Sequence, residues 1–233
     1  MPRVNASPGK IETALFAVGF AMAGLVLLAM LWSGPGAYAD MARSSGVSTG
    51  ATTVAFIDRL SGADVEMELG PLVEQHVVWS AYVTGGTPDP PPPGRFYTAD
   101  EISHMVDVRS VFDGAKLLIP AGLFVMAIRL QRARSRSLAA MLRLVRDGAI
   151  SAGVVLAAVG IVAAVAFDTA FLLFHQIFFP QGNFLFDPAT SNLIRLYPDW
   201  YWQGITFRIG LSFIGLAAAA AVAAAVGLRR ALH

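Results

Sequence analysis

Apolar residues in this chain occur in long uninterrupted blocks. Three blocks of about twenty residues, 13–32, 148–167 and 209–228, contain no charged side chain. At about 1.5 Å per residue, a helix of that length crosses a hydrocarbon core of roughly 30 Å. The pattern therefore predicts three membrane-spanning helices.

A fourth apolar block, 117–128, has only twelve residues between Lys116 and Arg129, and by itself it is typical of a buried or interfacial helix. If it spans, one side of the membrane carries ten Lys and Arg with two acidic residues, and the other carries seven basic and fourteen acidic residues. This separation agrees with the tendency of basic loops to stay cytoplasmic. We therefore expect four spans with both termini cytoplasmic, and Lys116 snorkelling outward to lengthen the short span.

The expected fold class is a mainly α membrane protein, a bundle of four transmembrane helices with a small extracytoplasmic cap that is α or α+β. A composition of 55% hydrophobic and 14% charged residues agrees with this, and zero cysteines exclude disulfides and thiolate nucleophiles. The expected parts are the N-terminus and first span (1–33), the cap (34–112), the second span (113–131), a basic cytoplasmic loop (132–147), the third span (148–175), an aromatic outer loop (176–204), and the fourth span with its cytoplasmic tail (205–233).

The first span has an alternative interpretation, because Ala37-Tyr38-Ala39 resembles a signal-peptidase site. The apolar run before it is about twenty residues long, and signal peptides carry roughly 7–15. The length favours a retained membrane anchor.

Within the cap, Pro88-Asp-Pro-Pro-Pro-Pro-Gly94 predicts an extended connector. Before it, Pro71–Thr84 fits a helix opening on proline, although its valines and aromatics also permit a strand. After it, Thr98 and Glu101 form a capping-box pattern that starts a helix, with Gly114 as the expected bend toward the second span.

Four ionisable residues lie within helical reach at the start of that helix: Asp100, Glu101, His104 and Asp107. A carboxylate there can orient the imidazole of His104. The alternative is that the acids favour the helix dipole and the histidine is a solvated surface ring.

Three further ionisable residues lie near the outer membrane boundary. Asp168 and Arg208 are at similar depth, and either form an ion pair or snorkel independently. His175 follows Asp168 by two helical turns and so shares its face. Pro180 ends the helix, and the aromatic segment 187–202 fits a lid at headgroup level. Taken alone, His175 is either a structural ring or a functional one.

Four segments together resemble the bacterial lipoprotein intramolecular transacylase family: Tyr97–Arg109, Phe174–Phe179, Phe186–Pro188 and Leu193–Pro198. The chain departs from the family pattern at Phe184 or Phe186, where a tryptophan is expected, and 41–70 shows no match. The resemblance implies transfer of the sn-2 acyl chain of a diacylglyceryl lipoprotein to its own N-terminal cysteine amine, giving a lyso-form lipoprotein. The implied location is the bacterial cytoplasmic membrane, with the active site at the outer leaflet and lipoproteins and phospholipid as partners.

The resemblance makes His175 the general acid and base and His104 a second catalytic or orienting group, with no metal or cofactor and no nucleic acid. Glu101, Asp107 and Asp168 are expected to support the histidines. Arg109, Arg195 and Arg208 are expected to hold substrate or oxyanion oxygens. On a straight helix, however, His104 would stand about 18 Å outside Lys116 and well above His175. Either the helix bends near Gly114 or the third helix projects farther outward.

Two other function classes stay open from the sequence. One is a non-catalytic membrane partner or chaperone of envelope proteins, in which the histidines are structural. The other is a metal-dependent membrane hydrolase, although the spacing of the four histidines favours no particular metal.

Overall fold

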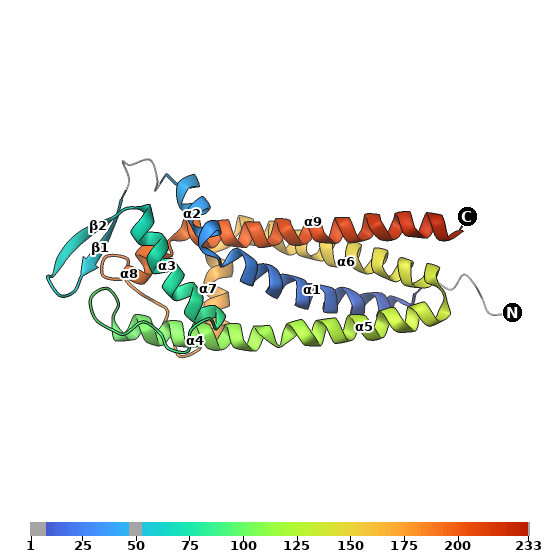
Figure 1. Cartoon of the computed structure of the whole chain (residues 1–233), viewed down its shortest axis with the longest axis horizontal. Helices are drawn as coiled ribbons and strands as arrows, with labels where there is room; N and C mark the ends of the chain where they lie inside the picture. Colours follow the sequence, from blue (N-terminus) through green and yellow to red (C-terminus); the bar gives the residue numbers. More distant parts are fainter. Residues whose placement is uncertain (1–7, 47–52, 233) are drawn as a thin grey trace. The chain divides into compact units, whose positions relative to one another are not determined.

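The computed structural model describes residues 8–46 and 53–232 and is mainly helical (Figure 1). Four helical stretches are long and apolar enough to cross a membrane: Lys10–Trp32, Ala99–Arg136, Leu138–Val165 and Asp199–Ala231. The prediction of a mainly α protein with four spans is confirmed. The elements in chain order are α1 (Lys10–Trp32), α2 (Pro35–Ser44), β1 (Val54–Asp58), β2 (Ala63–Met67), α3 (Leu69–Thr84), α4 (Ala99–Lys116), α5 (Leu118–Arg136), α6 (Leu138–Val165), α7 (Phe167–Phe178), α8 (Asn192–Leu196) and α9 (Asp199–Leu232).

The described residues form two compact units. One comprises 8–29, 115–165 and 208–232, and contains most of the residues in the four apolar stretches. We call it the membrane unit. The other comprises 30–46, 53–114 and 166–207, and we call it the cap unit.

Small residues let the helices of the membrane unit approach closely. Gly19 of α1 and Gly122 of α5 meet backbone to backbone, and Gly148 of α6 leaves room for the ring of Phe16. Phe213 of α9 is fully buried with Ala17 and neighbouring alanines. Because lipid offers no hydrophobic drive for helix association, such close packing is what holds a membrane bundle together.

The cap unit combines helices with a small sheet. Strands β1 and β2 pair antiparallel, with Val54 opposite Met67 and Asp58 opposite Ala63, and Gly62 takes a positive φ of 73° in the turn. The segment 71–84, for which helix and strand were both open, forms most of α3. This helix ends at Gly85, whose left-handed φ of 87° is a conformation that glycine adopts without steric cost. The cap is therefore α+β.

The start of α4 confirms the predicted capping box. The backbone N–H of Glu101 donates to Thr98 Oγ1 at 3.1 Å, and the Thr98 N–H donates to Glu101 Oε2 at 2.7 Å. The regular helix is interrupted at Leu117 and not at Gly114. Pro120 accounts for this, because it has no N–H to offer the Lys116 carbonyl and its ring crowds that carbonyl.

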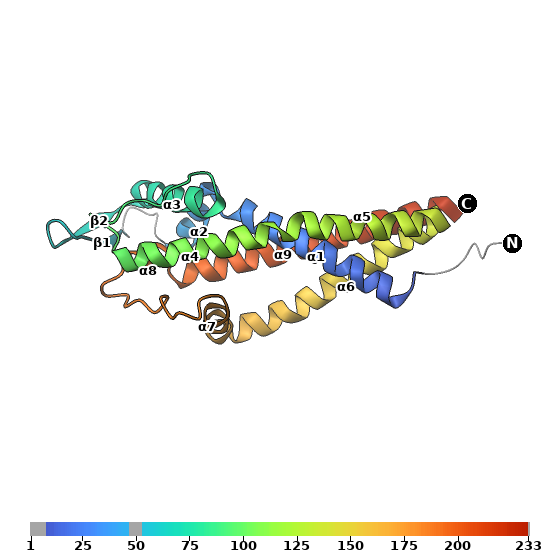
Figure 2. The ribbon, with the colours of Figure 1, turned by 90° about the horizontal axis from the view of Figure 1, so that it is seen from below.

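The third apolar stretch differs from the single helix expected over 148–175. Ser137 caps α6 by accepting the Ala140 N–H at 3.0 Å, so most of the expected loop 132–147 is helical. At its far end α6 stops at Val165, and Ala166, with φ −126° and ψ 47°, separates it from α7 (Figure 2). No proline or glycine marks this break, so the sequence did not indicate it.

The Gly19–Gly122 contact can be tested by adding one methyl group. A Cβ at Gly122 would lie 2.5 Å from the Gly19 carbonyl oxygen and 3.1 Å from the Ala23 nitrogen, both backbone atoms that cannot rotate away. Gly122→Ala is expected to destabilise the protein by about 1–3 kcal/mol, as overpacking does. The measurement is thermal unfolding of the detergent-solubilised protein.

Gly160→Ala is the matched control, because a Cβ at this α6 position meets nothing within 4 Å. It should leave the unfolding midpoint unchanged or slightly raised, since alanine is the better helix former. Equal midpoints for the two variants would show that the glycine contact does not constrain the bundle.

Candidate active site

An apolar cavity of about 170 Å³ lies within the cap unit. Its walls come from α3, α4, α7, α8 and the first turns of α9, and aromatic side chains dominate them. Three histidines are among the lining residues: His76, His104 and His175. An apolar pocket with a few convergent polar groups is the usual form of a small-molecule or lipid site.

His104 of α4 and His175 of α7 lie side by side at this cavity. Their ring centroids are 6.1 Å apart and the rings are inclined by only 22°. The expectation that His104 would stand well above His175 is therefore wrong, and His175 lies on α7, a helix of its own that begins after Ala166. The structure thus brings together the two histidines that the sequence singled out.

The ring of His175 is held in one tautomer. Its Nδ1 lies 2.8 Å from the Phe171 carbonyl oxygen, which can only accept, so Nδ1 carries the proton and donates. Nε2 is then left with its lone pair. Burial lowers the pKa of His175 below its ordinary value of 6.5, and the hydrogen bond to Phe171 opposes this shift. His175 is therefore neutral at pH 7, with Nε2 able to accept a proton.

His104 is buried, with 7% of its surface exposed, between the rings of Phe179 and Phe186 at 4.9 and 5.7 Å. Its Nδ1 makes no hydrogen bond of normal geometry within the described residues, and neither does Oδ1 of Asn183, although the Asn183 side chain lies close enough to interact with the His104 ring. Buried polar atoms are rarely left unpaired except where a ligand or water supplies the partner. His104 thus offers an unused polar atom at the cavity.

Asp107, expected to orient His104, instead binds the loop that follows α7. Its Oδ2 accepts from Gln181 Nε2 at 2.7 Å and from Asn183 Nδ2 at 2.5 Å. Both amides are thereby fixed in orientation, and the carbonyl end of Asn183 is the one left free. Through these two hydrogen bonds the Asp107 carboxylate holds the loop that carries Phe186 against His104.

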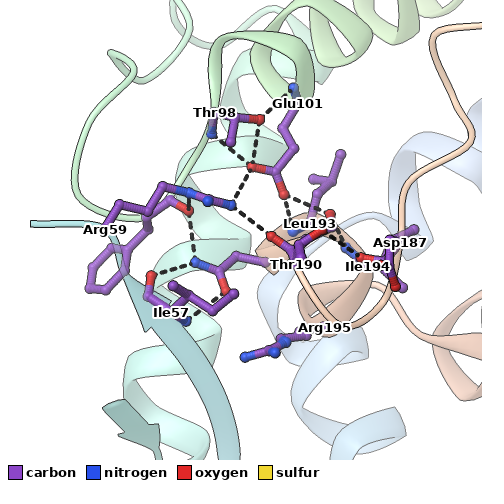
Figure 3. Close-up of polar contacts among 12 residues, drawn as sticks. Ile57, Arg59, Thr98, Glu101, Asp187, Thr190, Leu193, Ile194 and Arg195 are labelled. Atoms are coloured by element: carbon purple, nitrogen blue, oxygen red, sulfur yellow. Dashed lines mark hydrogen bonds and ion pairs between the residues drawn. The ribbon is translucent and has the colours of Figure 1, made fainter. Parts of the chain in front are cut away.

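Glu101 connects three parts of the cap unit (Figure 3). Only 1% of it is exposed. Oε1 accepts from Ser191 Oγ at 2.6 Å and from the Leu193 N–H at 2.9 Å, while Oε2 receives the Thr98 donors and lies 3.5 Å from the Arg59 guanidinium. The side chain fastens the first turn of α4 to α8 and to the end of β1. It positions the helix that carries His104 but does not line the cavity.

The expected arginine ligands are engaged with backbone carbonyls. Arg109 donates to Thr87 and Pro88 at 2.6 and 3.1 Å, and its guanidinium lies over the Tyr82 ring. Arg195 donates to the carbonyls of Ala55, Pro188 and Ala189. Neither residue lines the cavity. These contacts give both arginines a structural role in the cap unit.

The other two expected residues lie elsewhere. Asp168 is exposed in the first turn of α7, where a carboxylate is favourable to the helix dipole. Arg208 belongs to the membrane unit, at the start of its α9 segment.

Sequence reasoning missed a second polar cluster at the cavity. His76, 1% exposed, donates from Nε2 to the Ser33 carbonyl at 3.1 Å and accepts at Nδ1 from the Tyr197 hydroxyl at 3.2 Å. Burial lowers its pKa to about 4, so the ring is neutral. Tyr38 stacks on it at 4.4 Å and donates to the Leu196 carbonyl. These residues are far apart in the sequence and share no motif, so only the fold identifies them.

Asn192 was also missed. It is fully buried, accepts the Ile57 N–H and donates to the carbonyls of Ile57 and Phe96. Its side chain thus pairs with β1 as a neighbouring strand would. The only sequence signal is its place directly after Ser191, which caps α8.

Comparison with known proteins identifies the family. The family model described as "Lipoprotein intramolecular transacylase Lit" matches residues 58–202. This match covers more than half of the chain. The chain belongs to the lipoprotein intramolecular transacylase family. A comparison with curated proteins found no match.

Solved structures of the transacylase Lit from Bacillus cereus share the fold of this family member. One in meso structure is 16% identical with a TM-score of 0.70, covering 95% of this chain and 97% of that one. A variant in which a histidine is replaced by arginine is 15% identical with a TM-score of 0.68, covering 96% and 94%. A third, with a histidine replaced by alanine, has a TM-score of 0.69 at 14% identity and covers 95% and 94%. The predictions of an integral membrane protein and of a transacylase family enzyme are confirmed.

The Glu101 contacts of this transacylase family member can be tested by changing one oxygen to nitrogen. Glu101→Gln replaces one carboxylate oxygen by an NH₂ group. At least one buried donor, such as the N–H of Thr98 or Leu193, would then face another donor and lose its acceptor. Leaving such groups unpaired is expected to cost about 1–3 kcal/mol, more if the charge matters to Arg59. Thermal unfolding and proteolysis of the cap in detergent are the measurements.

Asp100→Asn is the control, because Asp100 is the exposed neighbour in the same helical turn. It should change stability by no more than a few tenths of a kcal/mol through the helix dipole. If both variants unfolded alike, the buried carboxylate would not be what joins α4 to α8.

Proposed function

We propose that this protein transfers the sn-2 acyl chain of a diacylglyceryl lipoprotein to the amine of that lipoprotein's N-terminal cysteine, by histidine acid–base catalysis. The observation that carries the proposal is the pairing of His104 and His175 at an apolar cavity, with Nε2 of His175 free to accept a proton. Family membership supports the reaction class.

The proposed chemistry has two proton transfers. The amine nitrogen attacks the ester carbonyl carbon, the N–C bond forms, and the amine proton passes to Nε2 of His175. When the C–O bond to the glyceryl oxygen breaks, the same proton is returned to that oxygen, which leaves as a hydroxyl. A neutral histidine can serve as base and then as acid at pH 7. Because amine and ester belong to one substrate, no covalent enzyme intermediate is needed.

His104 is proposed as the second polar group of the site. Its ring is close enough to His175 to contact the same substrate. If Nδ1 carries the proton, it can donate to a substrate carbonyl or to the developing oxyanion; if Nδ1 is unprotonated, it can accept from a substrate donor. Asp107 is proposed to position it indirectly, by holding Asn183 and the aromatic loop that carries Phe186. Glu101 positions the helix that bears it.

The aromatic walls suit the acyl part of the substrate. Phe171, Phe174, Phe179, Phe184 and Phe186 line the cavity around the histidines. They exclude water from the ester and contact an alkyl chain by dispersion. Lipoproteins and membrane phospholipid are accordingly the proposed partners, and the active site is proposed at the outer leaflet with both termini cytoplasmic.

His175→Ala is expected to lower the rate of acyl transfer by at least about 10²-fold, the lower end of what a general acid–base contributes. The readout is mass spectrometry of lipoprotein N-termini, from a bacterium lacking its own amino-acylating enzymes. The lyso-form mass should disappear in the variant. His76→Gln is the comparison, because it changes a buried histidine that lines the same cavity but is already fully hydrogen-bonded. Normal lyso-form levels with His175→Ala would remove His175 from the mechanism.

The pH dependence gives an independent test. His175 acts as base only when neutral, and its pKa lies below 6.5, so activity should fall as pH drops through that lowered value. The substrate amine, with an ordinary pKa of about 7.7–8.0, must also lose its proton. The logarithm of the initial rate should therefore rise with slope two at low pH, slope one between the two pKa values, and then level off. A slope that stays at one over the whole acid range in which the protein remains folded would mean that no enzyme base titrates.

A further inference from the structure

Helix α7 exposes an unusual amount of apolar surface. Of its twelve residues only His175 is buried. The exposed fractions of its large apolar side chains are 44% for Leu172, 51% for Leu173, 45% for Phe174, 70% for Ile177 and 47% for Phe178. We call these five residues the α7 apolar face. In water such a contiguous patch is unfavourable, and it marks a surface that contacts something apolar.

The chain before α7 indicates what that contact is. Only Ala166 separates α7 from α6, one of the four helices suited to cross the membrane. Ile161, Val162 and Val165, in the last turns of α6, are 67%, 69% and 85% exposed, as expected of residues facing lipid. The apolar exposure of α6 thus continues along the chain into α7. Since α7 begins where a span ends, its first residues lie at the membrane boundary.

The residues that follow Asp168 also suit contact with lipid. No residue from 169 to 186 is an Asp, Glu, Lys or Arg, so the segment can enter lipid without burying a fixed charge. At twelve residues α7 measures about 18 Å, too short to span. Asp168, the one fixed charge of α7, is exposed in the first turn, and the rest of the helix is uncharged. A short helix of this kind, with one apolar face and one face turned to protein, is suited to lie within a leaflet interface.

We propose that the α7 apolar face is a lipid-contacting surface inserted into the acyl region of the membrane leaflet. His175 lies on the opposite, buried side of the same helix. Phe174 belongs to the apolar face and also lines the cavity, so it separates lipid from the histidines. The helix therefore forms the wall between the leaflet and the cavity, a placement that stands whether or not the proposed reaction is the right one.

The absence of cysteine from the chain makes a single-site test direct. Ile177→Cys carries a nitroxide spin label in the full-length protein, reconstituted into phosphatidylethanolamine–phosphatidylglycerol vesicles. Collision with oxygen, which concentrates in lipid, is compared with collision with a nickel chelate, which stays in water. The label at 177 should be relaxed several-fold more by oxygen than by the chelate.

Two matched variants calibrate the measurement. Leu60→Cys lies between β1 and β2, is 79% exposed in the cap unit, and should favour the nickel chelate. Ile161→Cys on α6 should favour oxygen. A label at 177 that behaves like the one at 60 would overturn the proposal.

A second copy of the chain covering this face would also overturn it. In that case labels at 177 on two copies would broaden each other's spectra, and mixing with excess unlabelled protein would remove the broadening. The measurement needs no turnover, so an inactive His175→Ala protein carrying the same label should give the same accessibility. The test of location is thus independent of the test of function.

Discussion

The buried carboxylate of Glu101 is the interaction on which the arrangement of the cap depends. It caps the helix in which it lies and at the same time receives donors from the start of α8, 90 or more residues away. A carboxylate with 1% of its surface exposed is stable only if its lone pairs are filled, and here several donors converge on the two oxygens. That requirement fixes the first turn of α4 against Ser191 and the start of α8. His104, one turn further along α4, is placed as a result.

The site itself depends on a break in a helix. His175 lies on the separate helix α7, which begins after Ala166, and its ring is 6.1 Å from that of His104. The Phe171 carbonyl then selects the tautomer of His175, and the aromatic surroundings lower its pKa. Asp107, Asn183 and Gln181 tie the loop after α7 back to α4. The contacts of Asp107 join α4 to the loop after α7, and both segments contribute residues to the cavity lining.

Two arginines that the sequence suggested as substrate ligands, Arg109 and Arg195, make contacts that stabilise the cap unit. Arg109 donates to backbone carbonyls of the irregular segment after α3. Arg195 donates to carbonyls of the loop before α8 and to the Ala55 carbonyl of β1, and buried carbonyls need such donors. The guanidinium group suits this work because it presents five donors in a rigid fork. The unpaired backbone carbonyls of the cap loops are thus sufficient to explain why arginines lie beside them. Asn192, which sequence reasoning did not single out, likewise hydrogen-bonds the backbone of β1, through the N–H and the carbonyl of Ile57.

The sequence by itself determined the number of spans, the capping box at Thr98 and Glu101, the two histidines and the family resemblance. These are local properties: uncharged length, residue spacing within a turn, and short motifs. The tertiary structure decided what spacing cannot show: the break at Ala166, the β1–β2 hairpin, the buried His76 cluster and the true partners of Glu101, Asp107, Arg109 and Arg195. All of these depend on contacts between segments distant in sequence, where the need to pair buried polar atoms selects the partner, and no local pattern records that choice.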